Sequence, residues 1–175
     1  MNVLVTYYSL TGNTEKIARV ICKEVSKKHK VDLKKIEEIN ADTLNDYELV
    51  FVGSPCHAGD LAGPVKNLLN NIPNSPKYKL AGFFTHFSPL WSKEDHDKTR
   101  VSFETISKQK QINYLGTFHC RGAPTFSPEI AEMVKKAKKL SDEEYNGIVE
   151  EARKHPSPED EERAREFAQI IMSKK

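Results

Sequence analysis

The chain has 175 residues, of which 38% are hydrophobic and 30% are charged, and its formal net charge is +2 at pH 7. This length suits one domain with a sizeable core, expected to span residues 1–175. The near-neutral charge gives no support for a nucleic-acid partner, and no apolar run approaches the roughly 20 residues that a membrane span needs.

The N-terminal stretch reads as a strand, a tight turn and a helix. The apolar run Val3–Tyr7 predicts a buried strand, and apolar residues at helical spacing begin at Ile17. The turn between them is rich in hydroxyls and has no Lys or Arg between Tyr8 and Glu15. Because the N-terminus carries no charged leader segment, we expect a cytoplasmic protein.

The turn has the features of a phosphate site. Unpaired N–H groups and the positive end of the dipole at the start of a helix attract an anion. A glycine lets the backbone approach the anion closely, and hydroxyl and amide side chains add donors. The expected ligands of the phosphate are Ser9, Thr11, Gly12, Asn13 and Thr14. The alternative is a strand-to-helix turn that binds no ligand.

Three further stretches predict strands. Val31–Ile36 alternates like a half-exposed edge strand, whereas Leu49–Gly53 and Leu80–Phe84 are continuously apolar, which is typical of central parallel strands. A loop of turn-forming residues, 54–63, follows the second of these stretches. Pro64 then suits the first turn of a helix.

The second half of the chain continues the alternation. Residues 85–91 form a loop with aromatic side chains, 93–110 have weak helical spacing, and Ile112–His119 predicts a fifth, edge-like strand. Strands that alternate with helices predict an α/β fold with a doubly wound, five-stranded parallel sheet. Right-handed crossovers and a phosphate loop after the first strand favour the strand order 2-1-3-4-5.

Extra helices are expected at the C-terminus. Ser127–Leu140 and Ser141–Lys154 have helical patterns, and the second opens on a capping-box motif. A His-Pro step breaks the pattern before the last helix, which begins near Pro158. Residues 127–154 are therefore a helical insertion, interpreted as a rim of the ligand site. The alternatives are that the insertion enlarges the core or joins two copies of the chain in a homodimer.

The three cysteines, Cys22, Cys56 and Cys120, have neither metal-ligand spacing nor a Cys-x-x-Cys pair. We therefore expect free thiols and predict no metal site. Packing in its loop is the favoured interpretation of Cys56.

The phosphate-loop residues carry a resemblance to a known family. Ser9, Thr11, Gly12 and Thr14 match the flavodoxin pattern Ser/Thr-x-Thr-Gly-x-Thr, and their place after the first strand matches as well. The resemblance implies noncovalent FMN, bound by the loops after strands one, three and four. The strand order 2-1-3-4-5 with its ligand site is itself the flavodoxin pattern, so this ligand position is taken over from the family. The resemblance also implies FMN contacts from the second and third loops, namely Pro55, Cys56, His57, Ala58, Gly59, Thr85, His86, Phe87 and Trp91.

Two departures from the family bear on function. The second loop lacks the aromatic side chain that usually covers one flavin face, while the third loop offers Phe87 and Trp91 for stacking. The alternative for Trp91 is packing in the core under the loop. The chain is also not acidic, unlike most electron-carrier flavodoxins. His57 and His86 are interpreted either as donors to the flavin ring or as solvated loop residues.

These observations favour an FMN-dependent oxidoreductase, in which the flavin carries the chemistry and electrons or hydride pass to a small acceptor. One alternative is a flavodoxin-type electron carrier between protein partners. Another is a ligand-binding regulatory domain without redox work. The sequence names neither the electron donor nor the acceptor, and it predicts a small-molecule or protein redox partner.

Overall fold

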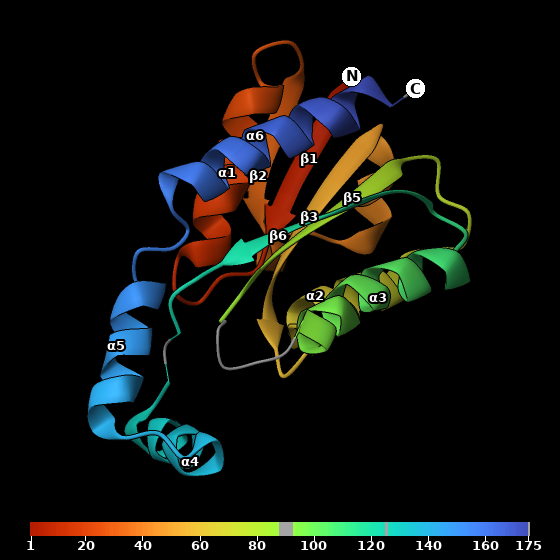
Figure 1. Cartoon of the computed structure of the whole chain (residues 1–175). Coiled ribbons are helices and arrows are strands. Elements are labelled where there is room, and N and C mark those ends of the chain that lie inside the picture. The colour runs from red at the N-terminus through yellow and green to blue at the C-terminus, as the bar shows by residue number, and fades with distance from the viewer. Residues whose placement is uncertain (88–92, 125, 175) are drawn as a thin grey trace.

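A computed structural model describes the chain except residues 88–92, 125 and 175, and it has an α/β architecture with helices on both faces of a twisted sheet (Figure 1). Five strands run parallel in the order β2-β1-β3-β5-β6. Their bounds are β1 (Asn2–Tyr7), β2 (Lys30–Lys35), β3 (Leu49–His57), β5 (Lys79–His86) and β6 (Asn113–Arg121). Counted among the parallel strands alone, this is the predicted order 2-1-3-4-5, which is confirmed.

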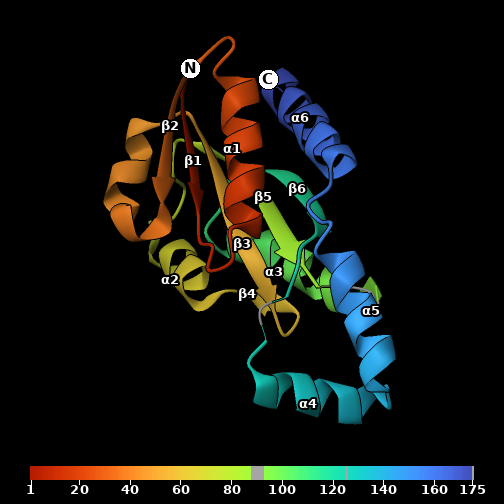
Figure 2. The ribbon, with the colours of Figure 1, turned by 90° about the vertical axis from the view of Figure 1, so that its left-hand side faces the viewer.

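The helices form a layer on each face of the sheet. One face is covered by α1 (Asn13–Val25) and α6 (Pro158–Ser173), which lie side by side (Figure 2). The other face is covered by α2 (Gly63–Asn71) and α3 (Lys93–Gln109). Two short 3-10 segments, Ile36–Glu38 and Ala41–Asp46, link β2 to β3.

Alternate residues of each central strand enter two separate cores. In β3, Val50 and Val52 face the α2–α3 layer, whereas Phe51 faces the α1–α6 layer. Both faces of a central parallel strand are buried, which explains its continuously apolar sequence. Gly53 in the same strand leaves room for Phe83 of β5, because a Cβ at Gly53 would lie 2.2 Å from the ring.

Residues 54–63 differ from the predicted loop. β3 continues to His57, turns back through Ala58 and Gly59, and pairs antiparallel with the short strand β4 (Asp60–Leu61). Ala58 and Gly59 have φ values of 51° and 80°, as a two-residue hairpin turn with positive φ at both positions requires. The prediction ended β3 at Gly53 because the polar residues after it lack a strand period.

The ends of β5 and β6 were also predicted too early. β5 continues through Thr85 and His86, which were predicted in a loop, and β6 continues to Arg121. The ladder between β5 and β6 extends to the pair His86 and Arg121. Backbone pairing between neighbouring strands therefore determines where these strands end. The local sequence does not indicate this pairing.

The predicted insertion forms two helices, α4 (Pro128–Lys138) and α5 (Asp142–Ala152). We call them the arm, because they extend beyond the layers that cover the sheet (Figures 1 and 2). Ser127 caps α4, and Ser141 and Glu144 form the predicted capping box of α5. The arm is thus delimited by its own local signals.

Across the described part of the chain, none of the helices combines the length and the apolar character needed to cross a membrane.

Candidate cofactor site

The turn between β1 and α1 is shaped by Gly12 and Asn13. Gly12 has φ 83° and its N–H donates to Ser9 Oγ at 3.1 Å. The Asn13 amide donates to Thr11 Oγ1 and to the carbonyl of Ala123, both at 2.8 Å. Serine side chains cap α4, α5 and α6, whereas no described side chain caps α1. The first-turn N–H groups of α1 are therefore not used by a cap and can face an anion.

The Thr14 side chain is buried rather than exposed to solvent. The residue is 1% exposed, and its hydroxyl shares a 2.9 Å hydrogen bond with the hydroxyl of Thr85 at the end of β5. This buried bond ties the first predicted loop to the third. A contact between Thr14 and a ligand stays a prediction.

A cavity of about 130 Å³ lies where the predicted loops meet. Parallel strands end at the same edge of a sheet, and we call this the carboxyl edge. Eight predicted site residues line the cavity: Thr11, Asn13, Pro55, Cys56, His57, Thr85, His86 and Phe87. Ser9, Gly12, Thr14, Ala58 and Gly59 do not line it, and Trp91 lies outside the described residues.

The prediction missed a fourth wall, formed by the segment after β6. Gly122, Ala123, Pro124 and Phe126 line the cavity. A Cβ at Gly122 would lie 3.0 Å from the Asn13 side chain, so glycine permits this close approach. The Phe126 ring packs edge-on against Phe87, with centroids 5.5 Å apart. Gly122, directly after β6, was the sequence signal that could have indicated this wall.

His86 is part of a packed histidine pair. Its Nε2 lies 3.0 Å from Nδ1 of His119 on β6, within hydrogen-bond distance. The His119 ring stacks on Phe84 at 5.1 Å with an interplanar angle of 12°. Because His86 is only 8% exposed, it is not the solvated loop residue of the alternative interpretation. His57, by contrast, is exposed beside the hairpin turn.

Polar side-chain contacts hold the hairpin of β3 and β4 against α2 and α3. Asp60 accepts hydrogen bonds from Lys66 of α2 and from Ser102 of α3, the latter at 2.7 Å. Burial alone would raise the pKa of Asp60, but these bonds and the Leu61 N–H outweigh it and lower the pKa. The Thr99 hydroxyl donates to Cys56 Sγ at 3.1 Å, as expected for a packed thiol.

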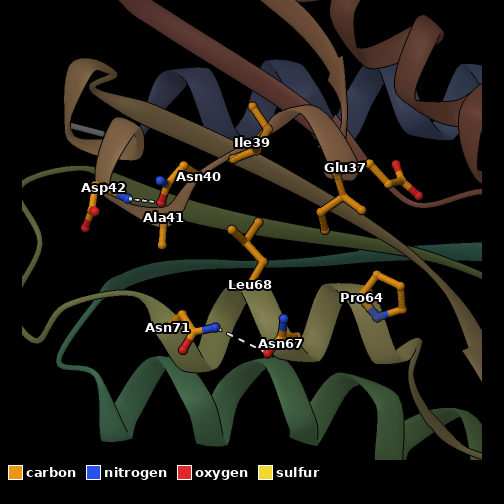
Figure 3. Close-up of a pocket in the computed structure, with 10 residues that line it drawn as sticks. Glu37, Ile39, Asn40, Ala41, Asp42, Pro64, Asn67, Leu68 and Asn71 are labelled. Carbon is orange, nitrogen blue, oxygen red and sulfur yellow. Dashed lines mark hydrogen bonds between the residues drawn. The ribbon is translucent and has the colours of Figure 1, made fainter.

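A second hollow, of about 570 Å³, lies between the 3-10 segments and α2 (Figure 3). Leu68 points from α2 toward Ile39 and Ala41 across this hollow. Among the described residues that line it, two are carboxylates, Glu37 and Asp42, and none is a lysine or an arginine. None of the predicted site residues that the structure describes lines it, and its negative charge disfavours a phosphate. The carboxyl edge is the better candidate for an anionic cofactor.

Comparisons with known proteins agree with this architecture. Residues 4–169 match the family model described as flavodoxin domain. The chain is 31% identical over 183 residues to the flavodoxin-like domain-containing protein BilS of Clostridioides difficile, covering 99% of this chain and 98% of that protein. It is 28% identical over 177 residues to the protein MJ0298 of Methanocaldococcus jannaschii, covering 98% and 99%.

Among solved structures, flavodoxin 2 from Bacillus cereus aligns with a TM-score of 0.69 and 21% identity over 100% of both chains. The rubredoxin:oxygen oxidoreductase of Desulfovibrio gigas aligns with a TM-score of 0.54 and 15% identity, over 98% of this chain and 37% of that one. At these identities the structural matches establish the fold alone. The family match over residues 4–169 shows that this chain belongs to the flavodoxin domain family.

Proposed function

We propose that the protein binds FMN noncovalently at the carboxyl edge and passes electrons or hydride to a small acceptor. The observation that carries this proposal is the cavity in which residues from all three predicted loops meet beside the uncapped start of α1. Bound flavin supplies the redox chemistry, and the protein supplies binding, orientation and electrostatics.

The turn before α1 suits a phosphate. A Cβ built at Gly12 has no heavy atom within 4 Å, so the space beside this backbone is open to a ligand. Thr11 is exposed, and its oxygen accepts from Asn13, which leaves the hydroxyl hydrogen available to donate. Such donors, together with the helix dipole, can hold a phosphate without a cation.

The cavity suits one part of the mononucleotide. Its 130 Å³ is below the range of about 300–1,000 Å³ that is usual for whole-ligand pockets. The remainder of the flavin would therefore lie over the outer loops. Phe87, braced by Phe126, provides an aromatic surface there, whereas the hairpin offers only the exposed His57. A less covered ring face favours a docked small acceptor, and stacking by Trp91 stays a prediction.

The second candidate is an electron carrier between proteins. The observation in its favour is alignment with flavodoxin 2 over the full length of both chains. The net charge of +2 argues against an electron carrier, because electron-carrier flavodoxins are typically acidic. A regulatory domain without a flavin is the third reading.

Two measurements separate these readings. Purified or reconstituted protein should be yellow with flavin absorbance, and failure to take up FMN would contradict the first two readings together. Stopped-flow mixing of the FMN-loaded protein with NADH or NADPH then tests the oxidoreductase. Rapid bleaching followed by reoxidation with a quinone supports it, whereas reduction that requires a protein donor indicates the carrier.

A further inference from the structure

Helix α4 carries an apolar stripe that faces solvent. Ile130 is 42% exposed, Met133 is 64% exposed, and Ala137 is also exposed. Steps of three and four residues place these side chains on one face of the helix. Val134, on the neighbouring face, is buried. Helix α4 therefore packs within its own chain through the face that holds Val134, and the exposed stripe lies outside that face.

The position of α4 leaves this stripe accessible. In both views α4 lies at the end of the arm that is farthest from the sheet (Figures 1 and 2). The arm is held together locally, since Lys135 pairs with Glu132 and Asp142 and lies 5.9 Å from the centre of the Tyr145 ring. The exposed side of α4 is available to another molecule.

The charges beside the stripe indicate which kind of partner would bind to it. Glu129 and Lys136 are both exposed and lie seven residues apart, on the same flank of the stripe. With Ile130, Met133 and Ala137 as heptad positions a, d and a, these two charges occupy successive g positions. In an antiparallel helix pair, g positions face g positions of the other helix. A two-fold axis near Met133 then brings Glu129 of each copy opposite Lys136 of the other.

A parallel pair would lack these contacts. Its g positions face e positions of the other helix, and the central e residue here is the buried Val134. Opposite charges repeated on one flank thus match an antiparallel second copy of the same helix.

We propose that α4 is a self-association surface through which two copies of this chain pair antiparallel. The helix has 11 residues, so the contact is smaller than the roughly 1,200–2,000 Å² of a standard stable interface. The dimer therefore dissociates on dilution.

Sedimentation velocity of the full chain over a range of protein concentrations tests this pairing. The wild-type protein is expected to pass from monomer to dimer as concentration rises. Met133→Glu buries a charge in the interface and should raise the dimer Kd at least about tenfold. Ile170→Glu is the matched control, because Ile170 is 55% exposed on α6, away from the stripe, and should leave the Kd unchanged.

A charge exchange identifies the orientation. Lys136→Glu places like charges across the pair and should weaken the dimer by about threefold to tenfold at low salt. Adding Glu129→Lys restores opposite charges, so the double variant should regain the wild-type Kd to within about twofold. Circular dichroism of each variant checks that α4 remains helical. A monomer at every concentration, a dimer that Met133→Glu leaves intact, or a double variant no tighter than Lys136→Glu would each overturn the proposal.

Discussion

The carboxyl edge of the sheet and the arm are held by different kinds of interaction. At the edge, side-chain bonds join residues that are distant in sequence, such as Thr14 to Thr85 and Asn13 to Ala123. In the arm, helix caps and ion pairs join residues that are close in sequence. The edge is therefore fixed by the core that surrounds it, whereas the arm can change sequence without disturbing that core.

The two regions meet at the first turn of α1. Asn13 donates to the carbonyl of Ala123 before the arm, and Lys16 Nζ donates to the carbonyl of Pro156 after it, at 2.7 Å. Lys16 also pairs with Glu161 of α6 at 3.0 Å. The helix that would receive the FMN phosphate thus also fastens both ends of the arm.

The largest expected effect on stability lies in the body of the sheet. Gly53→Ala places a Cβ 2.2 Å from the ring of Phe83, which is fully buried, so the ring has to shift within the core. We expect a loss of about 2–3 kcal/mol in the free energy of unfolding. Urea denaturation measures it, and a change within about 0.5 kcal/mol would show that this part of the sheet is loosely packed.

Asp160 at the junction of arm and body should have the next largest effect. Its side chain is 8% exposed and bonds to His155 at 2.6 Å and to the Ser157 N–H at 3.0 Å. Burial raises the pKa of Asp160, but the bonds from His155 and Ser157 outweigh it, so the net shift is downward. Asp160→Asn should cost about 1–3 kcal/mol at pH 7.

The same carboxylate predicts a pH dependence. A group whose pKa is lower in the folded state stabilises the protein above its unfolded pKa of about 3.9 and loses this contribution as pH falls through the folded pKa. The difference between the wild-type protein and Asp160→Asn should therefore shrink below about pH 4. A difference that grows with acid would assign the effect to another group.

Removal of the arm should have a smaller effect on cofactor binding. We propose that the arm selects the acceptor, because it leaves the carboxyl edge at Phe126, which lines the cavity. Replacement of residues 127–154 by a short Gly-Ser linker should leave the FMN Kd within about threefold and change the acceptor preference. Full activity with every acceptor tried would contradict this role.

The smallest effect is expected within the arm itself. Gly147 lies in α5, and a Cβ there has no heavy atom within 4 Å. Gly147→Ala should raise the free energy of unfolding of the arm by about 0.5–1 kcal/mol, because alanine favours a helix interior. Hydrogen exchange of α5 amides reports this change. Faster exchange in the variant would contradict the expectation that alanine stabilises this position of α5.

The sequence predicts features that depend on local pattern. The apolar runs Val3–Tyr7 and Leu49–Gly53 indicate two buried strands, and Gly12 with the hydroxyl side chains beside it indicates the turn before α1. It does not predict features that depend on pairing over long sequence distances. The His86–His119 pair belongs to this group, as does the cavity wall beginning at Gly122. In each case the partner lies on another turn or strand.

The most direct test of the central claim compares FMN with riboflavin, which lacks only the phosphate. Fluorescence titration of the apoprotein should show FMN binding about 100-fold or more tightly than riboflavin. Because Thr11 is exposed, Thr11→Ala should spare the fold and weaken FMN by about tenfold to a hundredfold, or about 1.5–3 kcal/mol, with riboflavin unchanged. Equal affinities for the two flavins in the wild-type protein would contradict a phosphate site at the start of α1.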